Sequence, residues 1–174
     1  MEQVILVDTK DRVLGTMEKM EAHEKALLHR AFSVFVFDDH GNMLLQQRAS
    51  TKYHSGGLWT NSCCSHPRPE EDTLTAANRR LKEEMGFETE LQKVFDFVYK
   101  ADFDNGLTEH EFDHVFVGTY NGPILPDPAE VSNYTFQSME AIQASLQKNP
   151  EWYTPWFHIA FPKMQQWWLQ RLLA

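Results

Sequence analysis

The sequence predicts an α+β fold with more strands than helices. Three observations favour it: short β-branched and aromatic runs bounded by turns, one periodic and highly charged helical segment, and apolar residues at helical spacing near the C-terminus. The chain has 174 residues, of which 42% are hydrophobic and 13% aromatic. That content is enough for a sizeable core, so we expect residues 1–174 to form a single domain.

Runs of β-branched and aromatic residues predict the strands. These runs are residues 3–7, 31–37, 43–48, 93–101 and 112–120. The DDHGN turn between the second and third runs predicts a hairpin, and DFDNGL forms a turn between the last two.

Periodicity predicts a helix between residues 72 and 85. Leu74, Ala77 and Leu81 recur at the helical period, and Gly86 suits a left-handed cap after the last turn. A charged pattern follows the same segment, because Arg79 and Glu83 are four residues apart, as are Arg80 and Glu84. Such pairs share a helix face, and on pattern alone they are typical of a solvated helix with ordinary ion pairs.

Two further helices are expected near the C-terminus. MEAIQASLQKN at 139–149 predicts a short helix, and residues 161–174 predict another with Pro162 near its start. The apolar residues of the last helix at helical spacing are Met164, Trp168 and Leu172.

Charge and cysteine content exclude several classes of protein. A net charge of −9, without a concentrated basic stripe, argues against nucleic-acid binding. The N-terminal stretch lacks a basic leader and a small-residue cleavage site, and no segment is long enough to span a bilayer. The two cysteines are adjacent and give no disulfide framework, which suits a reducing compartment. We therefore expect a soluble, cytoplasmic protein.

Both cysteines lie in one stretch, WTNSCCSHP at residues 59–67. If this stretch is extended, Cys64 and His66 point to one face and Cys63 to the other. A disulfide between neighbouring cysteines would strain the backbone. The pattern predicts one working thiol beside a metal-binding histidine, with Cys63 serving in packing.

A second pattern of charge lies in the strand that contains EHEFD. Glu109, Glu111 and Asp113 alternate, so their carboxylates emerge on one face, whereas His110 and His114 point to the other. A charged strand face is more often simply solvated, and a single histidine is more often a surface or hydrogen-bonded residue.

The end of the charged helix, RRLKEEMGF, resembles the Nudix box. The residues that match are Glu71, Arg79, Leu81, Glu83, Glu84, Gly86 and Phe87. Ser65 stands where the box has glycine, and Arg80 where it has glutamate. In Nudix pyrophosphohydrolases the helix glutamates hold the magnesium that promotes attack by water, so the arginine disfavours hydrolysis while the resemblance implies the same fold.

The arginine at position 80 and several other motifs are similar to those of the type I isopentenyl-diphosphate isomerases. The resemblance covers nearly the whole chain. The motifs are Glu18 to His23, Leu28 to Ser33, Leu44 to Lys52, Trp59 to Pro67, Tyr99 to Ala101, Glu109 with Glu111, and Pro155-Trp156. The resemblance implies a Nudix-like mixed sheet flanked by helices, and isomerisation of isopentenyl to dimethylallyl diphosphate for isoprenoid biosynthesis.

The resemblance also implies two metal sites. The first holds manganese, zinc or magnesium with three histidines and two glutamates, a donor set suited to near-octahedral coordination. Its residues are His23, His29, His66, Glu109 and Glu111. In the second, a magnesium ion bridges Glu84 and the substrate diphosphate, in line with its preference for carboxylate and phosphate oxygens.

The implied catalytic residues flank a flat five-carbon unit. Cys64 and Glu111 exchange protons with carbon, Tyr99 hydrogen-bonds to the glutamate, and Trp156 stabilises a carbocation, with Trp59 on the pocket wall. Which of Cys64 and Glu111 donates the proton stays open. The basic residues implied to grip the diphosphate are Lys19, Arg48, Lys52 and Arg80.

The sequence leaves two alternative functions open. One is a Nudix hydrolase acting on a nucleoside or prenyl diphosphate. The other is a non-catalytic module in which Cys64, His66, His23 and His29 hold a structural zinc ion. For the isomerase we expect a small-molecule prenyl diphosphate as partner and a monomer or homodimer, without nucleic acid or membrane.

Overall fold

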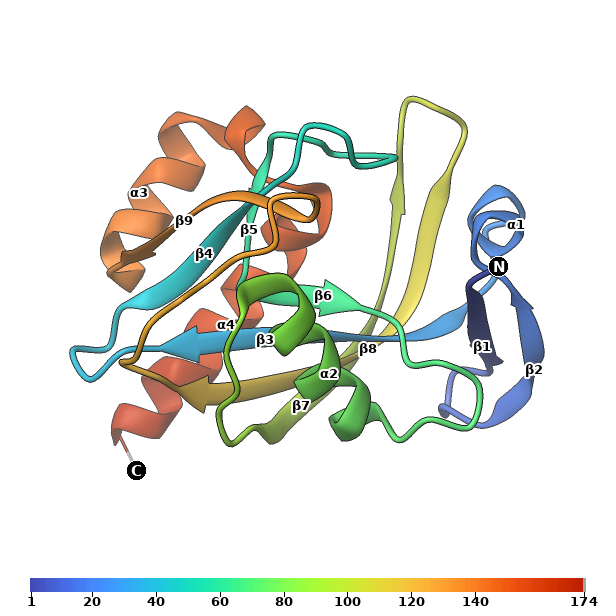
Figure 1. Ribbon diagram of the computed structural model, residues 1–174, viewed down its shortest axis with the longest axis horizontal. Coiled ribbons are helices and arrows are strands. Elements are labelled where there is room, and N and C mark those ends of the chain that lie inside the picture. Colours follow the sequence, from blue (N-terminus) through green and yellow to red (C-terminus); the bar gives the residue numbers. More distant parts are fainter. Residues whose placement is uncertain (174) are drawn as a thin grey trace.

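The computed structural model describes residues 1–173 as one mixed sheet of nine strands flanked by four α-helices (Figure 1). The strands are β1 (Gln3–Val7), β2 (Val13–Glu18), β3 (His29–Phe37), β4 (Met43–Arg48), β5 (Trp59–Thr60), β6 (Cys63–Ser65), β7 (Gln92–Asp102), β8 (Thr108–Thr119) and β9 (Val131–Gln137). The helices are α1 (Lys19–Glu24), α2 (Thr73–Met85), α3 (Met139–Lys148), a 3₁₀ turn at Pro150–Trp152, and α4 (Pro155–Leu173). The predicted α+β class is confirmed.

Strand β3 is the hub of the sheet. It pairs antiparallel with β1, β4 and β6, and parallel with β8 over nine residue pairs from His29↔Glu111 to Phe37↔Thr119. The predicted hairpin between β3 and β4 forms only next to its turn, where Phe37 pairs with Met43. Beyond that pair, β4 separates from β3 and pairs antiparallel with β5 and β9.

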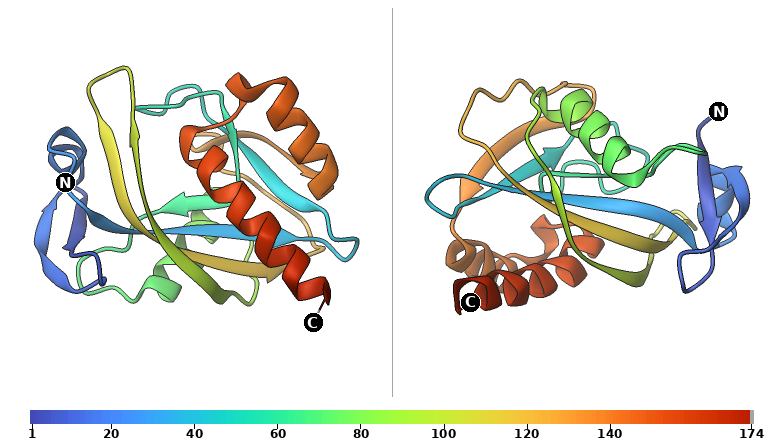
Figure 2. Two further views of the ribbon diagram at one scale, coloured as in Figure 1. Left: turned by 180° about the vertical axis from the view of Figure 1, so that it is seen from behind. Right: turned by 90° about the horizontal axis from the view of Figure 1, so that it is seen from below.

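The two faces of the sheet carry two apolar cores. Figure 2 shows α2 on one face of the sheet and α4 on the other. Phe32, Val34 and Val36 of β3 pack with the buried face of α2, whereas Phe35 and Phe37 pack with α3 and α4. The alternation along a strand therefore divides β3 between the two cores.

Helix α2 forms where the periodicity predicts it. The side chain of Asp72 accepts a hydrogen bond from the Thr75 backbone N–H at the N-terminus, and Gly86 caps the C-terminus in the left-handed region, with φ 74°. Ala77 and Leu81 are fully buried. Leu74, in contrast, is 39% exposed, because the first turn extends beyond the sheet-facing core.

The prediction for the last helix is wrong about its start. Helix α4 begins at Pro155, and Pro162 lies inside it. Proline costs nothing at the first position of a helix, where its missing N–H has no partner, and the Thr154 hydroxyl caps the Phe157 N–H. Leu172 is 63% exposed, so the apolar stripe does not reach the last turn.

Three elements had no clear pattern in the sequence. Helix α1 spans only six residues, too few to show a period, and β2 and β9 are mostly half-buried or exposed. Among residues 1–173, no helix combines the length and apolarity needed to cross a bilayer.

The backbone around Gly86 leads to a stability prediction. A Cβ at this position would overlap the backbone carbonyl of Leu125, whose N–H donates to the Met85 carbonyl at 3.0 Å. We expect Gly86→Ala to lower the free energy of unfolding by about 2–5 kcal/mol, because left-handed strain and a backbone overlap add. Gly106 also has a positive φ, 79°, with no atom within 4 Å of an added Cβ, so Gly106→Ala should cost only about 1–2 kcal/mol. Urea titrations of both variants measure this difference, and equal losses would contradict it.

Candidate active site

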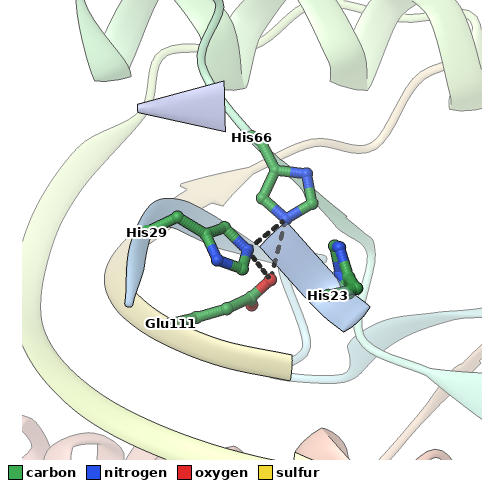
Figure 3. A group of neighbouring side chains, drawn as sticks. All are labelled: His23, His29, His66 and Glu111. Atoms are coloured by element: carbon green, nitrogen blue, oxygen red, sulfur yellow. Dashed lines mark hydrogen bonds and ion pairs between the residues drawn. The ribbon is translucent and has the colours of Figure 1, made fainter. Parts of the chain in front are cut away.

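A buried cluster of imidazoles and carboxylates lies at the N-terminal end of β3 (Figure 3). The Nε2 atom of His66 lies 2.8 Å from Glu111 Oε2, and the Nε2 atom of His29 lies 3.3 Å from the same oxygen. The Nε2 atoms of His29 and His66 are 3.2 Å apart. His23, from α1, offers a fourth donor atom, all four lying within 4.8 Å of one another.

The hydrogen bonds behind the rings suit a bound cation. The Nδ1 atoms of His23 and His29 face the carbonyl oxygens of Lys19 and Leu27, at 2.7 and 2.9 Å. A carbonyl only accepts, so each Nδ1 carries the proton and each Nε2 presents its lone pair to the cluster. The Nε2 atom of His23 is buried and has no hydrogen-bond partner among the residues that the structure describes. Lone pairs and carboxylates that converge in a buried space fit a divalent metal ion.

Glu109 lies in an adjoining group that shares His23. Its Oε2 atom is 3.8 Å from His23 Nε2, and His54 completes this group. The hydroxyl of Tyr99 lies within hydrogen-bond distance of Oε1 of both Glu109 and Glu111. All five predicted ligands are thus buried and neighbouring, with four in one group and Glu109 in the next.

Cys64 belongs to neither donor group of the described residues. Its thiol donates to Asn61 Oδ1 at 3.0 Å and lies 3.6 Å from the Ser33 hydroxyl. The described side chains therefore do not bring this thiol into one donor group with His66, His23 and His29, as the closed zinc site would require.

The buried carboxyl groups have opposite electrostatic surroundings. Burial disfavours charge on Glu111, but hydrogen bonds and charge from His29 and His66 outweigh it when these imidazoles are protonated, so the pKa of Glu111 then lies well below its usual range. Burial raises the pKa of Asp113 well above its usual range, and the charge of Glu111 adds to the shift. Asp113 accepts a hydrogen bond from Ser33 at 2.7 Å.

The two cysteines face opposite sides of β6. Cys63 is fully buried in the core beneath α2, with its thiol 3.3 Å from Glu84 Oε2, whereas Cys64 lines the pocket together with His66. Burial is the main reason that the pKa of the Cys64 thiol is raised, and the charge of Asp113 adds to it. The resting thiol therefore keeps its proton.

A cavity of about 380 Å³ connects these groups with a set of basic side chains. The four predicted diphosphate-binding residues all line it: Lys19, Arg48, Lys52 and Arg80. Three of them are held by acidic residues. Lys19 pairs with Glu2 at 2.8 Å, and Lys52 and Arg80 share Glu130 at 2.6 and 3.4 Å.

Both arginines of this set retain unused hydrogen-bond donors. The Nε atoms of Arg48 and Arg80 are buried and find no hydrogen-bond partner in the described part of the chain. Because a buried donor without an acceptor is costly, both nitrogens suit an anionic ligand with several oxygens. Glu84 is 5% exposed and lies 3.0 Å from an Arg80 terminal nitrogen, at the same end of the cavity.

Trp156, from the first turn of α4, forms part of the cavity wall. It is 3% exposed, and the guanidinium carbon of Arg48 lies 5.1 Å from the centre of its ring. Trp59, which we expected on the pocket wall, is not among the residues that line this cavity and packs instead with the core beneath α4.

The sequence did not predict a place in the site for several side chains that lie there. Arg68 and Arg79 also line the cavity, and Ser33 and Asn61 contact the Cys64 thiol. His54 had no context in the sequence, yet it lies 3.4 Å from Glu109. The position of Ser33 could have been predicted from the sequence, because Ser33 lies on the same face of β3 as His29.

Comparisons with known proteins agree with this fold. Residues 27–158 match the NUDIX domain family. A solved structure from Deinococcus radiodurans has a TM-score of 0.71 at 18% identity, covering 85% of this chain and 90% of that chain. A MutT NUDIX hydrolase from Burkholderia pseudomallei has a TM-score of 0.59 at 19% identity, over 78% of this chain and 96% of its own. At such identities these structures show the fold alone.

Relatives with much higher identity carry one activity in their names. The isopentenyl-diphosphate Delta-isomerase of Burkholderia multivorans is 54% identical, over 90% of this chain and 89% of its own. Isopentenyl-diphosphate Delta-isomerase 2 of Aromatoleum aromaticum is 51% identical, over 89% and 82%. Isopentenyl-diphosphate Delta-isomerase 2 of Photorhabdus laumondii is 46% identical over 99% of both chains. The chain belongs to the isopentenyl-diphosphate Delta-isomerase family of NUDIX-domain proteins.

Proposed function

We propose that this protein isomerises isopentenyl diphosphate to dimethylallyl diphosphate and so supplies isoprenoid biosynthesis. The observation that carries the proposal is a single cavity lined by a protonated thiol, Cys64, a carboxylate, Glu111, and four basic side chains. The relatives described above support the same reaction.

The reaction moves a double bond by two proton transfers. A proton added to the terminal alkene carbon leaves a tertiary cation, and loss of a proton two carbons away forms the internal double bond. No proton is gained or lost overall. In our proposal Cys64 and Glu111 serve from opposite sides of the hydrocarbon, one as donor and the other as acceptor. Tyr99 orients the Glu111 carboxyl group by its hydrogen bond.

The cation must be kept from water. Trp156 is nearly completely buried, and its ring already lies beside the Arg48 guanidinium. An indole face is the best aromatic partner for a cation and contributes about 2 kcal/mol when desolvated. We assign Trp156 this stabilising role.

The diphosphate is assigned to Lys19, Arg48, Lys52 and Arg80. The unused Nε atoms of the two arginines support this, since charge-assisted bonds to phosphate would satisfy them. Glu84 lies against Arg80 and would help to hold a magnesium ion, which would supply positive charge for binding the diphosphate.

Manganese, zinc or magnesium would be held by the five-residue set. That set is His23, His29, His66, Glu109 and Glu111. When bound, the ion supplies the positive charge that holds two neighbouring carboxylates in a buried space and tunes the acidity of the Glu111 carboxyl group. The lone pairs that His23 and His29 present to this space support the assignment.

The setting of the enzyme is part of the proposal. We propose that residues 1–174 act as one domain in the cytoplasm, as a monomer or homodimer without nucleic acid or membrane. The two free cysteines agree with a reducing compartment.

Proton NMR with isopentenyl diphosphate tests the function directly. We expect the metal-loaded protein to convert the terminal alkene signal into that of dimethylallyl diphosphate. Prior chelation should slow conversion by at least about 100-fold, because the charge that the ion supplies is lost. Added Mn²⁺, Zn²⁺ or Mg²⁺ should restore it.

Two outcomes would contradict the proposal. Release of inorganic phosphate or a monophosphate without a shifted double bond would indicate a hydrolase. Full isomerisation by protein verified as metal-free would remove the five-residue metal site.

A further inference from the structure

His54 lies against the metal cluster although no motif points to it. It belongs to the loop between β4 and β5 and is 7% exposed. Its Nε2 atom lies 3.4 Å from Glu109 Oε2, and the two residues form a group of possible metal donors with His23.

The ring of His54 is held by contacts with distant parts of the chain. It stacks on Phe103, with centroids 4.3 Å apart and planes at 12°, and meets Trp156 edge-on at 5.6 Å. Its own carbonyl accepts a hydrogen bond from Arg48 at 3.2 Å. These contacts direct Nε2 toward Glu109.

The nitrogen that faces Glu109 has no hydrogen bond. The contact with Oε2 does not meet hydrogen-bond geometry. His54 Nε2, like His23 Nε2, is buried and has no hydrogen-bond partner in residues 1–173. His54 Nδ1 lies 3.3 Å from the Ser55 hydroxyl, which can accept its proton. With that tautomer, the lone pairs of His54 and His23 both point at one carboxylate oxygen, an arrangement that repels unless a cation lies between them.

The separations fit ligands around one ion. Donor atoms about 2.1 Å from an octahedral ion lie about 3.0 Å apart when adjacent and about 4.2 Å apart when opposite. Glu109 Oε2 lies 3.4 Å from His54 Nε2 and 3.8 Å from His23 Nε2, between these limits. The two donor groups share His23, so the donor atoms of the two groups adjoin each other at this residue.

We propose that His54 binds the divalent ion through Nε2 as a sixth protein ligand. This inference rests on the proposed metal centre and extends its donor set beyond the five residues of the family pattern. Six protein donors leave an octahedral ion no position for water, unlike hydrolytic metal sites, which keep one open. The ion would then hold Glu111 without generating a hydroxide nucleophile.

Histidine-ring ¹H–¹⁵N NMR of the unmodified full chain with Zn²⁺ tests this. At one equivalent of Zn²⁺ we expect the Nε2 signals of four histidines, including His54, to move to metal-bound positions. His54→Gln identifies the His54 signal by its loss. A His54 Nε2 signal that stays put, or that shows a directly attached proton in the loaded protein, would overturn the proposal.

Zn²⁺ affinity provides a second readout by competition with a chromophoric chelator. We expect His54→Gln to weaken binding by about 10–100-fold, the scale seen for residues that support a metal site. The matched control, His40→Gln, changes an exposed histidine in the β3–β4 turn and should bind as the original chain does. Equal affinity in His54→Gln and the original chain would overturn the proposal.

These readouts separate this inference from the proposed function. If the chain binds Zn²⁺ through His54 but does not shift the double bond, only the proposed function fails. If it isomerises while His54 stays unbound, only the sixth ligand fails.

Discussion

Cys64→Ala is expected to abolish isomerisation while leaving the fold intact. We expect kcat to fall by at least about 10³-fold, within the range that general acid–base residues contribute. The side chain faces the cavity and, within residues 1–173, makes polar contacts only with Asn61 and Ser33, so its loss removes a proton carrier without emptying a core. Turnover by proton NMR, together with circular dichroism and thermal unfolding, measures both effects.

Cys63→Ala is the matched control because it removes the same sulfur atom from the preceding residue. Cys63 lies in the core beneath α2, so we expect lower stability and isomerisation within about 10-fold of the original rate, because no proton carrier is lost. If Cys63→Ala were inactive and Cys64→Ala active, the assignment of the working thiol would be wrong.

Glu111→Gln is expected to stop the reaction as well, by about 10³-fold or more. The amide keeps the size of the side chain but cannot exchange a proton with carbon near neutral pH. The substitution also removes the negative charge of a proposed metal ligand beside His29 and His66, so it is expected to weaken metal binding. Metal content measured beside turnover separates these two effects, and we expect no isomerisation even in variant protein reloaded with metal.

Solvent deuterium sharpens this test. In D₂O the original chain should incorporate deuterium into substrate methyl groups, and Glu111→Gln should not. Glu88→Gln, a change at an exposed ion pair with Lys82, should behave as the original chain does. Deuterium incorporation by Glu111→Gln at the normal rate would exclude the proposed role of Glu111.

The sequence predicts best where geometry has a strict period. Alternation along an extended chain correctly separates Cys64 from Cys63, and it brings Glu109 and Glu111 to one face. Alternation cannot predict whether a charged face is buried, since that depends on elements packed over it. Glu109 and Glu111 are each only 6% exposed, against the commoner pattern of a solvated strand face.

The positions of some loop residues and of some helix ends could not be predicted from sequence patterns. His54 comes to the site because the β4–β5 loop folds back over the cavity, and nothing in the local sequence encodes that path. The true start of α4 depends on Pro155 and the Thr154 cap, which compete with Pro162 as a helix signal. In both cases tertiary contacts outweigh local preference.

The parallel register of β3 with β8 restricts which insertions and deletions this lineage can tolerate. One residue gained or lost within β8 would exchange its faces, turning Glu111 away from His29 and Val115 out of its core together. Loss of the site and loss of stability would therefore be inherited as one defect. Length variation among descendants should concentrate at residues 104–106, the exposed tip of the turn between β7 and β8.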